Sequence, residues 1–149
     1  MHKNIGKFMF LLKKSRHQFE HDLRVCGHTH GISGSEASVL LFFGNNPDFN
    51  NAKDAVCFRG FSKAYVSKAI NDLEKRGFIS EVEDEKDHRY QHIIIYDKAK
   101  DTLIDLQEIQ LKSMSFMKRN IDKKDFDTFM KVVNQMADNL IEQEKERHV

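Results

Sequence analysis

Hydrophobic residues recur at three- and four-residue steps along most of the chain, as one face of a helix requires. The first such stretch begins at Ile5 and is predicted to end between Gly27 and Gly31. Its apolar stripe consists of Ile5, Phe8, Leu12, Phe19 and Leu23. The chain has one proline and seven glycines, so few residues interrupt helices. We therefore expect a mainly α-helical protein.

Two shorter helices are predicted next, each with its own start signal. Ser33-Gly34-Ser35-Glu36 has the Ser-x-x-Glu spacing of a capping box, so the second helix begins near Ser33 and stops around Gly44. After a turn at Asn45 to Asp48, the stretch from Asn51 to Phe58 is a short third helix. Arg59-Gly60-Phe61 then turns the chain into a fourth helix.

The fourth predicted helix, Ser62 to Arg76, has two contrasting faces. Ser62 is its predicted N-cap. One face is apolar, formed by Val66, Ala69, Ile70 and Leu73. The opposite face is small, polar and basic, and comprises Ala64, Lys68, Asn71 and Lys75, flanked by Tyr65 and Ser67. Asn51 to Arg76 is thus a helix, a short turn and a helix, the arrangement that places its second helix in the DNA major groove.

A β-hairpin and two further helices complete the predicted elements. Gly77 ends the fourth helix, and the β-rich runs Phe78 to Val82 and Tyr90 to Tyr96 flank a charged tip, Glu83 to Arg89. Asp97 is predicted to cap a fifth helix that continues towards Met117, and Asp122 opens the last helix. The fifth helix carries Ala99, Leu103, Leu106, Ile109 and Leu111, and the last carries Phe126, Phe129, Met130, Val133, Met136, Ala137 and Leu140.

Size and composition narrow the class of protein. A chain of 149 residues suits one folding unit that completes its core by association. Its apolar runs are far shorter than a membrane span, and its first residues lack the pattern of a secretory signal, so we expect a cytoplasmic protein without membrane contacts. Cys26 and Cys57 have no Cys-x-x-Cys spacing, which fits a reducing compartment. The net charge of +1 does not discriminate between partners.

The exposed face of the fourth helix has side chains suited to double-stranded DNA. Asn71 pairs well with adenine, Ser67 bonds several base edges, and Tyr65 can contact a thymine methyl or a phosphate. Lys63 and Lys68 offer cations to guanine or phosphate. Around this helix the cations outnumber the two acids, Asp72 and Glu74; they are Arg59, Lys63, Lys68, Lys75 and Arg76. An amphipathic helix with ordinary surface lysines is the alternative on periodicity alone.

The predicted hairpin favours the DNA interpretation. A hairpin directly after such a helix can place its tip along the backbone or in the minor groove, where an arginine meets enhanced negative potential. Arg89 is positioned for this contact. Asp87 is expected to hold Arg89 or to fix the turn by a charge-assisted hydrogen bond, rather than to form an idle exposed pair.

The chain resembles the MarR family of winged helix-turn-helix regulators. The resemblance lies in Phe61 to Ile79, with Leu73-Glu74-Lys75-Arg76-Gly77 and the apolar pair Phe78-Ile79, followed by Asp87-His88-Arg89. It implies a mainly α fold with a small β-hairpin wing and a homodimer that binds a pseudo-palindromic operator, as a transcriptional repressor. Residues 1–149 would then be one domain, with 33–96 as the DNA-binding region and 1–26 and 97–147 as the helical dimerisation region. The expected DNA-binding residues are Ser62, Lys63, Ala64, Tyr65, Ser67, Lys68, Asn71, Lys75, Asp87 and Arg89.

Several positions depart from the family pattern. Family wings often carry an arginine where this chain has Glu81, and Glu83, Asp84 and Glu85 make the wing acidic. Wing contact with DNA would therefore depend on Arg89, with Lys86 as a second candidate. The threonine and glycine that usually follow the second wing strand are replaced by Tyr96 and Ala99, which leaves Asp97 as the expected cap.

The resemblance implies a signal that modulates DNA affinity, and three kinds of input stay open. A metal site would use Cys26, His28 and His30, near His17 and His21, but the fifth helix offers no further histidine. Cys26 would sense oxidants only if exposed and easily ionised, and a buried structural cysteine is the alternative. A phenolic or lipophilic effector would suit Phe10, Phe19, Phe42 and Phe43, although aromatic residues at helical spacing are usually core.

Enzymatic and non-DNA functions are the remaining alternatives. The chain contains no Gly-rich phosphate loop, no Gly-x-Ser-x-Gly and no His-Glu-x-x-His, so we expect no catalytic activity, no cofactor and no metal. A dimeric winged-helix protein that acts only through protein contacts is a stronger rival, because the wing is acidic.

Overall fold

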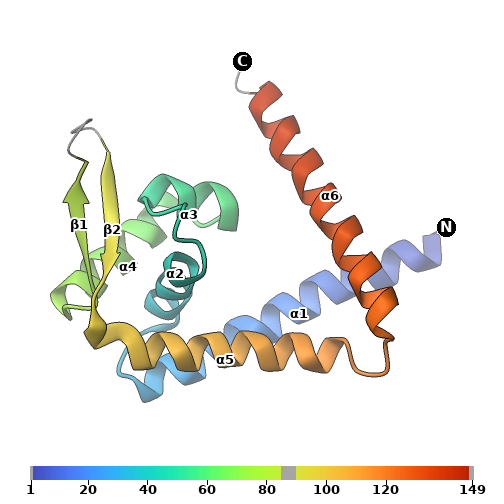
Figure 1. Cartoon of the computed structure of the whole chain (residues 1–149), viewed down its shortest axis with the longest axis horizontal. Helices are drawn as coiled ribbons and strands as arrows, with labels where there is room; N and C mark the ends of the chain where they lie inside the picture. The colour runs from blue at the N-terminus through green and yellow to red at the C-terminus, as the bar shows by residue number, and fades with distance from the viewer. Residues whose placement is uncertain (1, 85–89, 148–149) are drawn as a thin grey trace. The chain divides into compact units, whose positions relative to one another are not determined.

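The structure, a computed structural model, describes residues 2–84 and 90–147. It divides into two compact units, residues 1–113 and 114–149. The elements run in the order α1 (His2–Thr29), α2 (Gly34–Asn45), α3 (Ala52–Arg59), α4 (Lys63–Lys75), β1 (Ile79–Glu83), β2 (Gln91–Ile95), a 3-10 turn η1 (Asp97–Ala99), α5 (Lys100–Met117) and α6 (Lys123–Arg147) (Figure 1). The expected mainly α fold with a two-stranded hairpin is confirmed.

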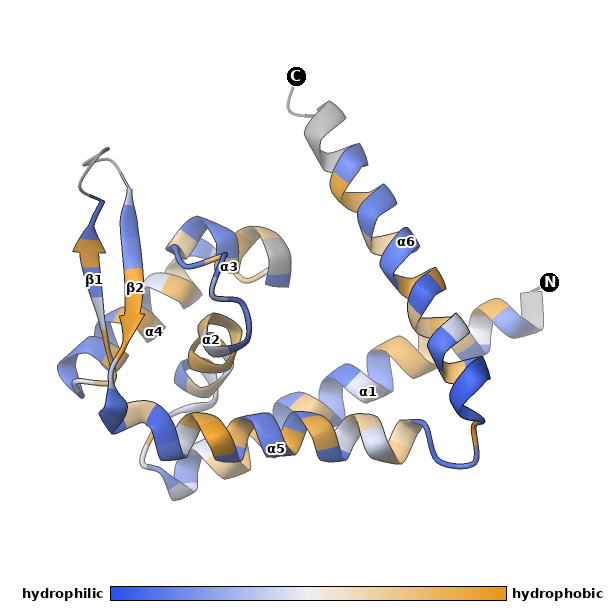
Figure 2. Cartoon of the chain, in the orientation of Figure 1, coloured by the Kyte–Doolittle hydropathy of each residue, from blue (hydrophilic) through white to orange (hydrophobic). Residues whose placement is uncertain are grey.

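Helix α2 is the centre of the first unit. Eight consecutive residues, Glu36 to Phe43, are buried, so this helix is covered on all sides. It contacts α1, α3, α4 and β2, and Figure 2 shows its apolar character. The core around it contains Leu23 of α1, Val66, Ala69, Ile70 and Leu73 of α4, Ile79 and Ile93 of the hairpin, and Leu106 of α5.

The starts of the short helices follow the predicted capping chemistry. Ser33 caps α2 in a full capping box, because its hydroxyl accepts from the Glu36 backbone and the Glu36 carboxylate accepts from the Ser33 backbone. Asn51 and Asp54 form the same box at α3. The hydroxyl of Ser62 accepts from the backbone of Tyr65, which confirms the predicted N-cap of α4.

The end of α4 sets the direction in which the hairpin leaves the helix. Gly77 adopts a φ of 71°, a left-handed conformation that favours glycine. Its N–H donates to the carbonyl of Glu74, and the N–H of Phe78 donates to the carbonyl of Leu73. These two bonds form a Schellman motif, and both Leu73 and Phe78 are buried beside it. The predicted helix end at Gly77 is confirmed.

Strands β1 and β2 pair antiparallel with Ile79 opposite Ile95 and Glu83 opposite Gln91. Residues between α2 and α3 support the free edge of β2, since the N–H of Ile93 donates to the Asn50 carbonyl at 2.7 Å. Ile79 and Ile93 point into the core, so the hairpin base is fixed by burial on one face.

One predicted detail at a helix end is wrong, and another is confirmed. Asp97 does not cap α5: it opens η1, the N-cap position belongs to Tyr96 without a side-chain bond, and the Tyr96 hydroxyl donates to Ser80 instead. The predicted end of the second helix, around Gly44, is confirmed to within one residue: α2 ends at Asn45, and the side chain of Asn46 donates to the carbonyl of Phe42. Gly44 has a packing role, because a Cβ there would lie 2.4 Å from Leu103 of α5.

Apolar side chains remain exposed on α1, α5 and α6, each considered within its own unit. On α1, Leu23 is buried and Phe19 packs against the core, whereas Ile5, Phe8 and Leu12 are exposed. On α5, Leu106 is buried, whereas Leu111 is 70% exposed. On α6, the exposed apolar residues include Phe129, Val132, Met136, Leu140 and Ile141. In the described part of the chain, no helix has the length and apolar character that crossing a membrane requires.

Candidate nucleic-acid interface

Helix α4 presents one face to solvent and packs the other against the core. Val66, Ala69, Ile70 and Leu73 are all buried, as the helical wheel predicted. Helices α2 and α3 and strand β1 contact α4 and hold its buried face. The exposed side chains are Ser62, Lys63, Ala64, Ser67, Lys68, Asn71 and Lys75. The structure therefore brings seven of the ten predicted site residues onto one solvent-facing surface.

Tyr65 differs from the other predicted site residues. It is half-buried, and its ring lies 4.8 Å from the ring of Phe61, measured between centroids. Phe61 in turn lies under the guanidinium of Arg59. Tyr65 thus flanks the exposed face of α4 at its first turn.

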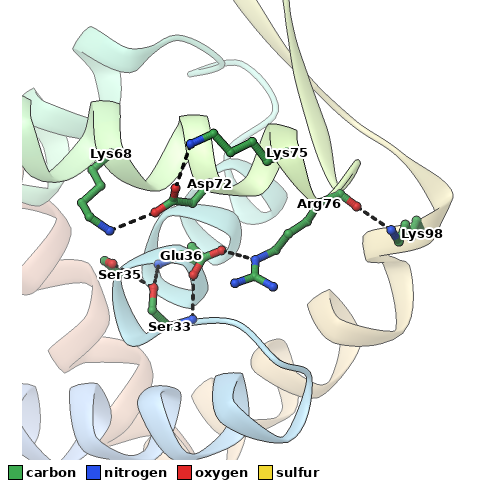
Figure 3. Close-up of polar contacts among 8 residues, drawn as sticks. All are labelled: Ser33, Ser35, Glu36, Lys68, Asp72, Lys75, Arg76 and Lys98. Carbon is green, nitrogen blue, oxygen red and sulfur yellow. Dashed lines mark hydrogen bonds and ion pairs between the residues drawn. The ribbon is translucent and has the colours of Figure 1, made fainter.

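Two lysines of the exposed face share one carboxylate. Lys68 Nζ lies 2.9 Å from Asp72 Oδ2, and Lys75 Nζ lies 3.7 Å from Asp72 Oδ1 (Figure 3). The hydrogen bond from Lys68 lowers the pKa of Asp72, and the same bond raises the pKa of Lys68. Both lysine side chains are about three-quarters exposed, at 76% and 77%, while Asp72 is 30% exposed. The charge of this face is therefore partly neutralised within the helix.

The last cation of α4 is bonded to a buried carboxylate. Arg76 Nε donates to Glu36 Oε1 at 2.6 Å, and the second oxygen of Glu36 accepts from the Ser33 backbone at 2.8 Å (Figure 3). Burial alone would raise the pKa of Glu36, but the hydrogen bonds from Ser33 and Arg76 outweigh it and lower this pKa. The pair joins the start of α2 to the end of α4.

Lys98 extends this connection towards α5. Its ammonium donates to the carbonyl of Arg76 at 2.5 Å and lies 5.9 Å from the ring centre of Phe78. Since the carbonyls at the end of a helix lack partners within it, a cation at this place stabilises the C-terminus of α4. The orientation of α4 is thus tied to α2 and to the turn that precedes α5.

His92 holds the end of the hairpin that lies nearest its tip. One ring nitrogen of His92 bonds Asn50 Oδ1 at 2.8 Å, and the other bonds Asp84 Oδ2 at 2.7 Å. On β1, burial and the Glu74 carboxylate raise the pKa of Glu81. Asp87 and Arg89, like Glu85 and Lys86, lie outside the described residues.

A cleft beside the first turn of α4 opens between α1, α2 and the turn that precedes α4. Its volume is about 380 Å³, and it is lined by Arg16, Glu20, Arg24, Gly34, Ser38, Gly60, Phe61, Ser62 and Tyr65. The aromatic residues proposed for an effector site are not among these: Phe42 and Phe43 are buried core residues, and Phe10 is 66% exposed on α1. The cleft combines charged side chains of α1 with the aromatic rings of Phe61 and Tyr65.

The cysteine and histidines near the end of α1 do not converge on a metal site. Among residues 2–84 and 90–147, no three His, Cys, Asp or Glu side chains are placed to hold a metal ion. His30 bonds Asp105 at 2.8 Å and Thr102 at 3.1 Å, so it links α1 to α5. Burial and the Asp105 charge raise the pKa of the Cys26 thiol, which disfavours the thiolate that an oxidant sensor needs.

Sequence reasoning missed the partners of α4 that come from distant elements. The bond between Arg76 and Glu36 spans 40 residues, and the bond between Lys98 and the Arg76 carbonyl spans 22. No periodicity signals such pairs. The bridge from Lys68 to Asp72, by contrast, has the i,i+4 spacing of a helical ion pair, which was available in the sequence.

Comparison with known proteins shows one segment of the chain that matches a family model. Residues 30–89 match the family model described as the MarR family. Comparison with curated protein sequences gave no match.

Solved structures extend the likeness to nearly the whole fold. A MarR-family regulator from Silicibacter pomeroyi is 16% identical with a TM-score of 0.77, covering 90% of this chain and 90% of that one. A putative MarR-family regulator from Listeria monocytogenes, complexed with a 26mer DNA, is 11% identical with a TM-score of 0.75, over 96% and 90% of the two chains. The MepR protein of S. aureus, in a DNA complex, is 13% identical with a TM-score of 0.70, over 89% and 96%.

The similarity to the family model covers the elements that form the exposed face of α4. The matched segment contains α2, α3, α4 and β1, the elements that build and brace the exposed face of α4. The likeness to the two solved structures extends beyond this segment, over 90% and 96% of the chain. The matched segment is similar to the MarR family, and the chain has the fold of the solved MarR-family winged helix-turn-helix structures.

Proposed function

We propose that the chain is a sequence-specific DNA-binding transcriptional regulator that acts as a repressor. Its recognition helix, α4, lies in the major groove, and its hairpin wing lies in or near the minor groove. The observation that carries the proposal is the exposed face of α4, where Ser67, Asn71 and three lysines face solvent above a buried apolar face. The DNA complexes of the Listeria protein and of MepR support it, since both share this fold.

Contacts on the exposed face divide into positioning and reading. Lys63 and the free N–H groups at the start of α4 suit phosphate oxygens, because the positive end of the helix dipole points there. Asn71 and Ser67 lie further along the same face and suit base edges. The other predicted contacts are Ser62, Ala64, Tyr65, Lys68 and Lys75 on α4, and Asp87 and Arg89 on the wing.

The active form in this proposal is a homodimer. The exposed apolar residues of α1, α5 and α6 support it, because each helix leaves a hydrophobic face without a partner in its own unit. Two copies related by a twofold axis would present two α4 helices to the half-sites of a pseudo-palindromic operator. Repression follows where the operator overlaps a promoter.

A small-molecule effector is expected to modulate this binding. The cleft lined by Arg16, Arg24, Ser62 and Tyr65 is the best supported position, because it adjoins both α1 and the N-cap of α4. A ligand there would contact a proposed dimerisation helix and the recognition helix together, which is what coupling between two sites requires. The cationic side chains favour an anionic or phenolic effector.

A mobility shift with DNA from the promoter beside the chain's own gene tests the proposal. We expect specific retardation that resists excess random DNA and weakens steeply as salt rises. The rival is a dimeric winged-helix protein that acts through protein contacts, which the acidic wing residues Glu83 and Asp84 keep open. A dimer that retards no DNA at low salt would support that rival and exclude the regulator.

A further inference from the structure

We infer that Asp72 acts as an internal competitor for DNA phosphate, which weakens DNA binding by the recognition helix and reduces its dependence on salt. The inference deepens the proposed function and rests on it. It concerns a residue that lies outside the predicted set of contacts, on the flank of the face that carries Lys68 and Lys75.

The pairing of charges around α4 is the first step. The helix and its caps carry four cations: Lys63, Lys68, Lys75 and Arg76. Lys68 and Lys75 are paired with Asp72, and Arg76 is paired with Glu36. Among the ion pairs of the described residues, none includes Lys63. Two carboxylates, Asp72 and Glu36, thus offset two of the four positive charges within the protein.

The position of Asp72 is the second step. Its two oxygens face opposite ways along the helix, one towards Lys68 and one towards Lys75 (Figure 3). A phosphate in the major groove offers the same ligand, an anionic oxygen at about 2.8 Å from an ammonium. The lysines can therefore bind phosphate only by leaving Asp72 or by sharing their charge with it.

The third step is that Asp72 and Glu36, the two carboxylates that pair with cations of α4, differ in exposure. Glu36 is 2% exposed and is bonded from three sides, so it is a fixed part of the fold. Asp72 is partly exposed, and its lysines are mostly in solvent, so their bonds exchange easily with water and anions. Asp72 thus adjusts affinity, whereas Glu36 holds the helix.

Replacement Asp72→Asn tests the inference by removing the charge while keeping the size. We expect binding to tighten roughly two- to fivefold per half-site, and roughly by the square of that for a dimer, because two exposed bridges no longer oppose DNA. The tightening should be equal on operator and random DNA. The slope of log affinity against log salt should steepen by about one per half-site.

A matched control exists on α6. Lys123 and Asp127 form a bridge of the same i,i+4 order, with 2.6 Å between Nζ and Oδ2. Asp127→Asn makes the same change in net charge on a helix other than α4, so it should leave the affinity within about twofold of wild type. Elution from heparin gives a readout without DNA, and Asp72→Asn should elute at higher salt than Asp127→Asn.

Four outcomes separate the possibilities. Equal tightening on both DNAs, with the control unchanged, supports the inference. Weaker binding of Asp72→Asn to the operator alone would overturn it, because Asp72 would then accept a hydrogen bond from a cytosine amino group. An affinity and heparin elution equal to those of the control would also overturn it. If the wild type bound no DNA at all, the proposed function on which the inference rests would instead be contradicted.

Discussion

Asn71 and Ser67 are the exposed side chains of α4 whose chemistry distinguishes one base from another. Replacing either by alanine should reduce discrimination by about 1 to 3 kcal/mol at one base position of each half-site. Lys63→Ala should instead weaken binding to every sequence and make the salt dependence shallower by about one unit per half-site. Competition binding with single-base operator variants measures the difference. A uniform loss in Asn71→Ala would assign Asn71 to a phosphate.

Arg89 is the expected contact of the wing tip. Arg89→Ala should weaken DNA binding, because an arginine in the narrow minor groove gains from its negative potential. Circular dichroism and sedimentation should show an unchanged fold and assembly. Unaltered affinity would contradict the wing assignment, and Lys86→Ala is the matched comparison, since it removes a neighbouring cation of the same tip.

The sequence alone placed some residues correctly because the signals that place them are local. The exposed face of α4 follows from helical period and from the burial of Val66, Ala69, Ile70 and Leu73, both of which are local. The pairing of Arg76 was not predictable, because Glu36 is 40 residues away in the sequence. The sequence count of cations over acids therefore overstated the charge that α4 has available for DNA.

At the scale of elements, the ion pair between the buried Glu36 and the half-exposed Arg76 joins α2 to α4. Arg76→Met should destabilise the fold by roughly 2 kcal/mol near neutral pH, less than for a fully buried pair because Arg76 is half exposed. Urea unfolding measures this loss. Arg119→Met, which removes an exposed arginine outside the pair, should cost little.

The stability that Arg76→Met loses should become smaller as the pH falls. The folded-state pKa of Glu36 is lowered below its ordinary value. The ionised carboxylate therefore stabilises the fold fully above that ordinary value, and its contribution disappears as the pH falls through the folded-state pKa. The difference between wild type and variant should be largest at neutral pH and shrink in acid. A difference that stayed constant from neutral pH to about pH 3 would contradict the pairing.

Element boundaries were predictable where a cap is local. Ser33, Asn51, Ser62 and Gly77 act through bonds within a few residues, and the sequence located them to within about one residue. Asp97 failed as a cap because the chain enters α5 through a 3-10 turn. The end of α2 was located to within one residue, but the close approach of Leu103 to Gly44 was not predictable, because it is a contact between distant segments.

At the scale of the whole molecule, the exposed apolar residues of α1, α5 and α6 predict self-association. Leu111→Asp should shift the protein from dimer to monomer, because it places a charge on an apolar surface that we expect to be buried between copies. Ile94→Asp is the matched control, since Ile94 is also exposed but lies on the wing. Sedimentation at several concentrations distinguishes them, and a Leu111→Asp dimer as stable as wild type would exclude Leu111 from the interface.

The most direct test of the account is a salt titration of DNA binding. Fluorescence anisotropy compares the promoter DNA beside the chain's own gene with random DNA of equal length, using wild type and Asn71→Ala. The account predicts tight, steeply salt-dependent binding that prefers the promoter DNA, with the preference reduced in the variant. Absence of binding by a folded dimer at low salt, or equal affinity of the wild type for both DNAs, would contradict sequence recognition by α4.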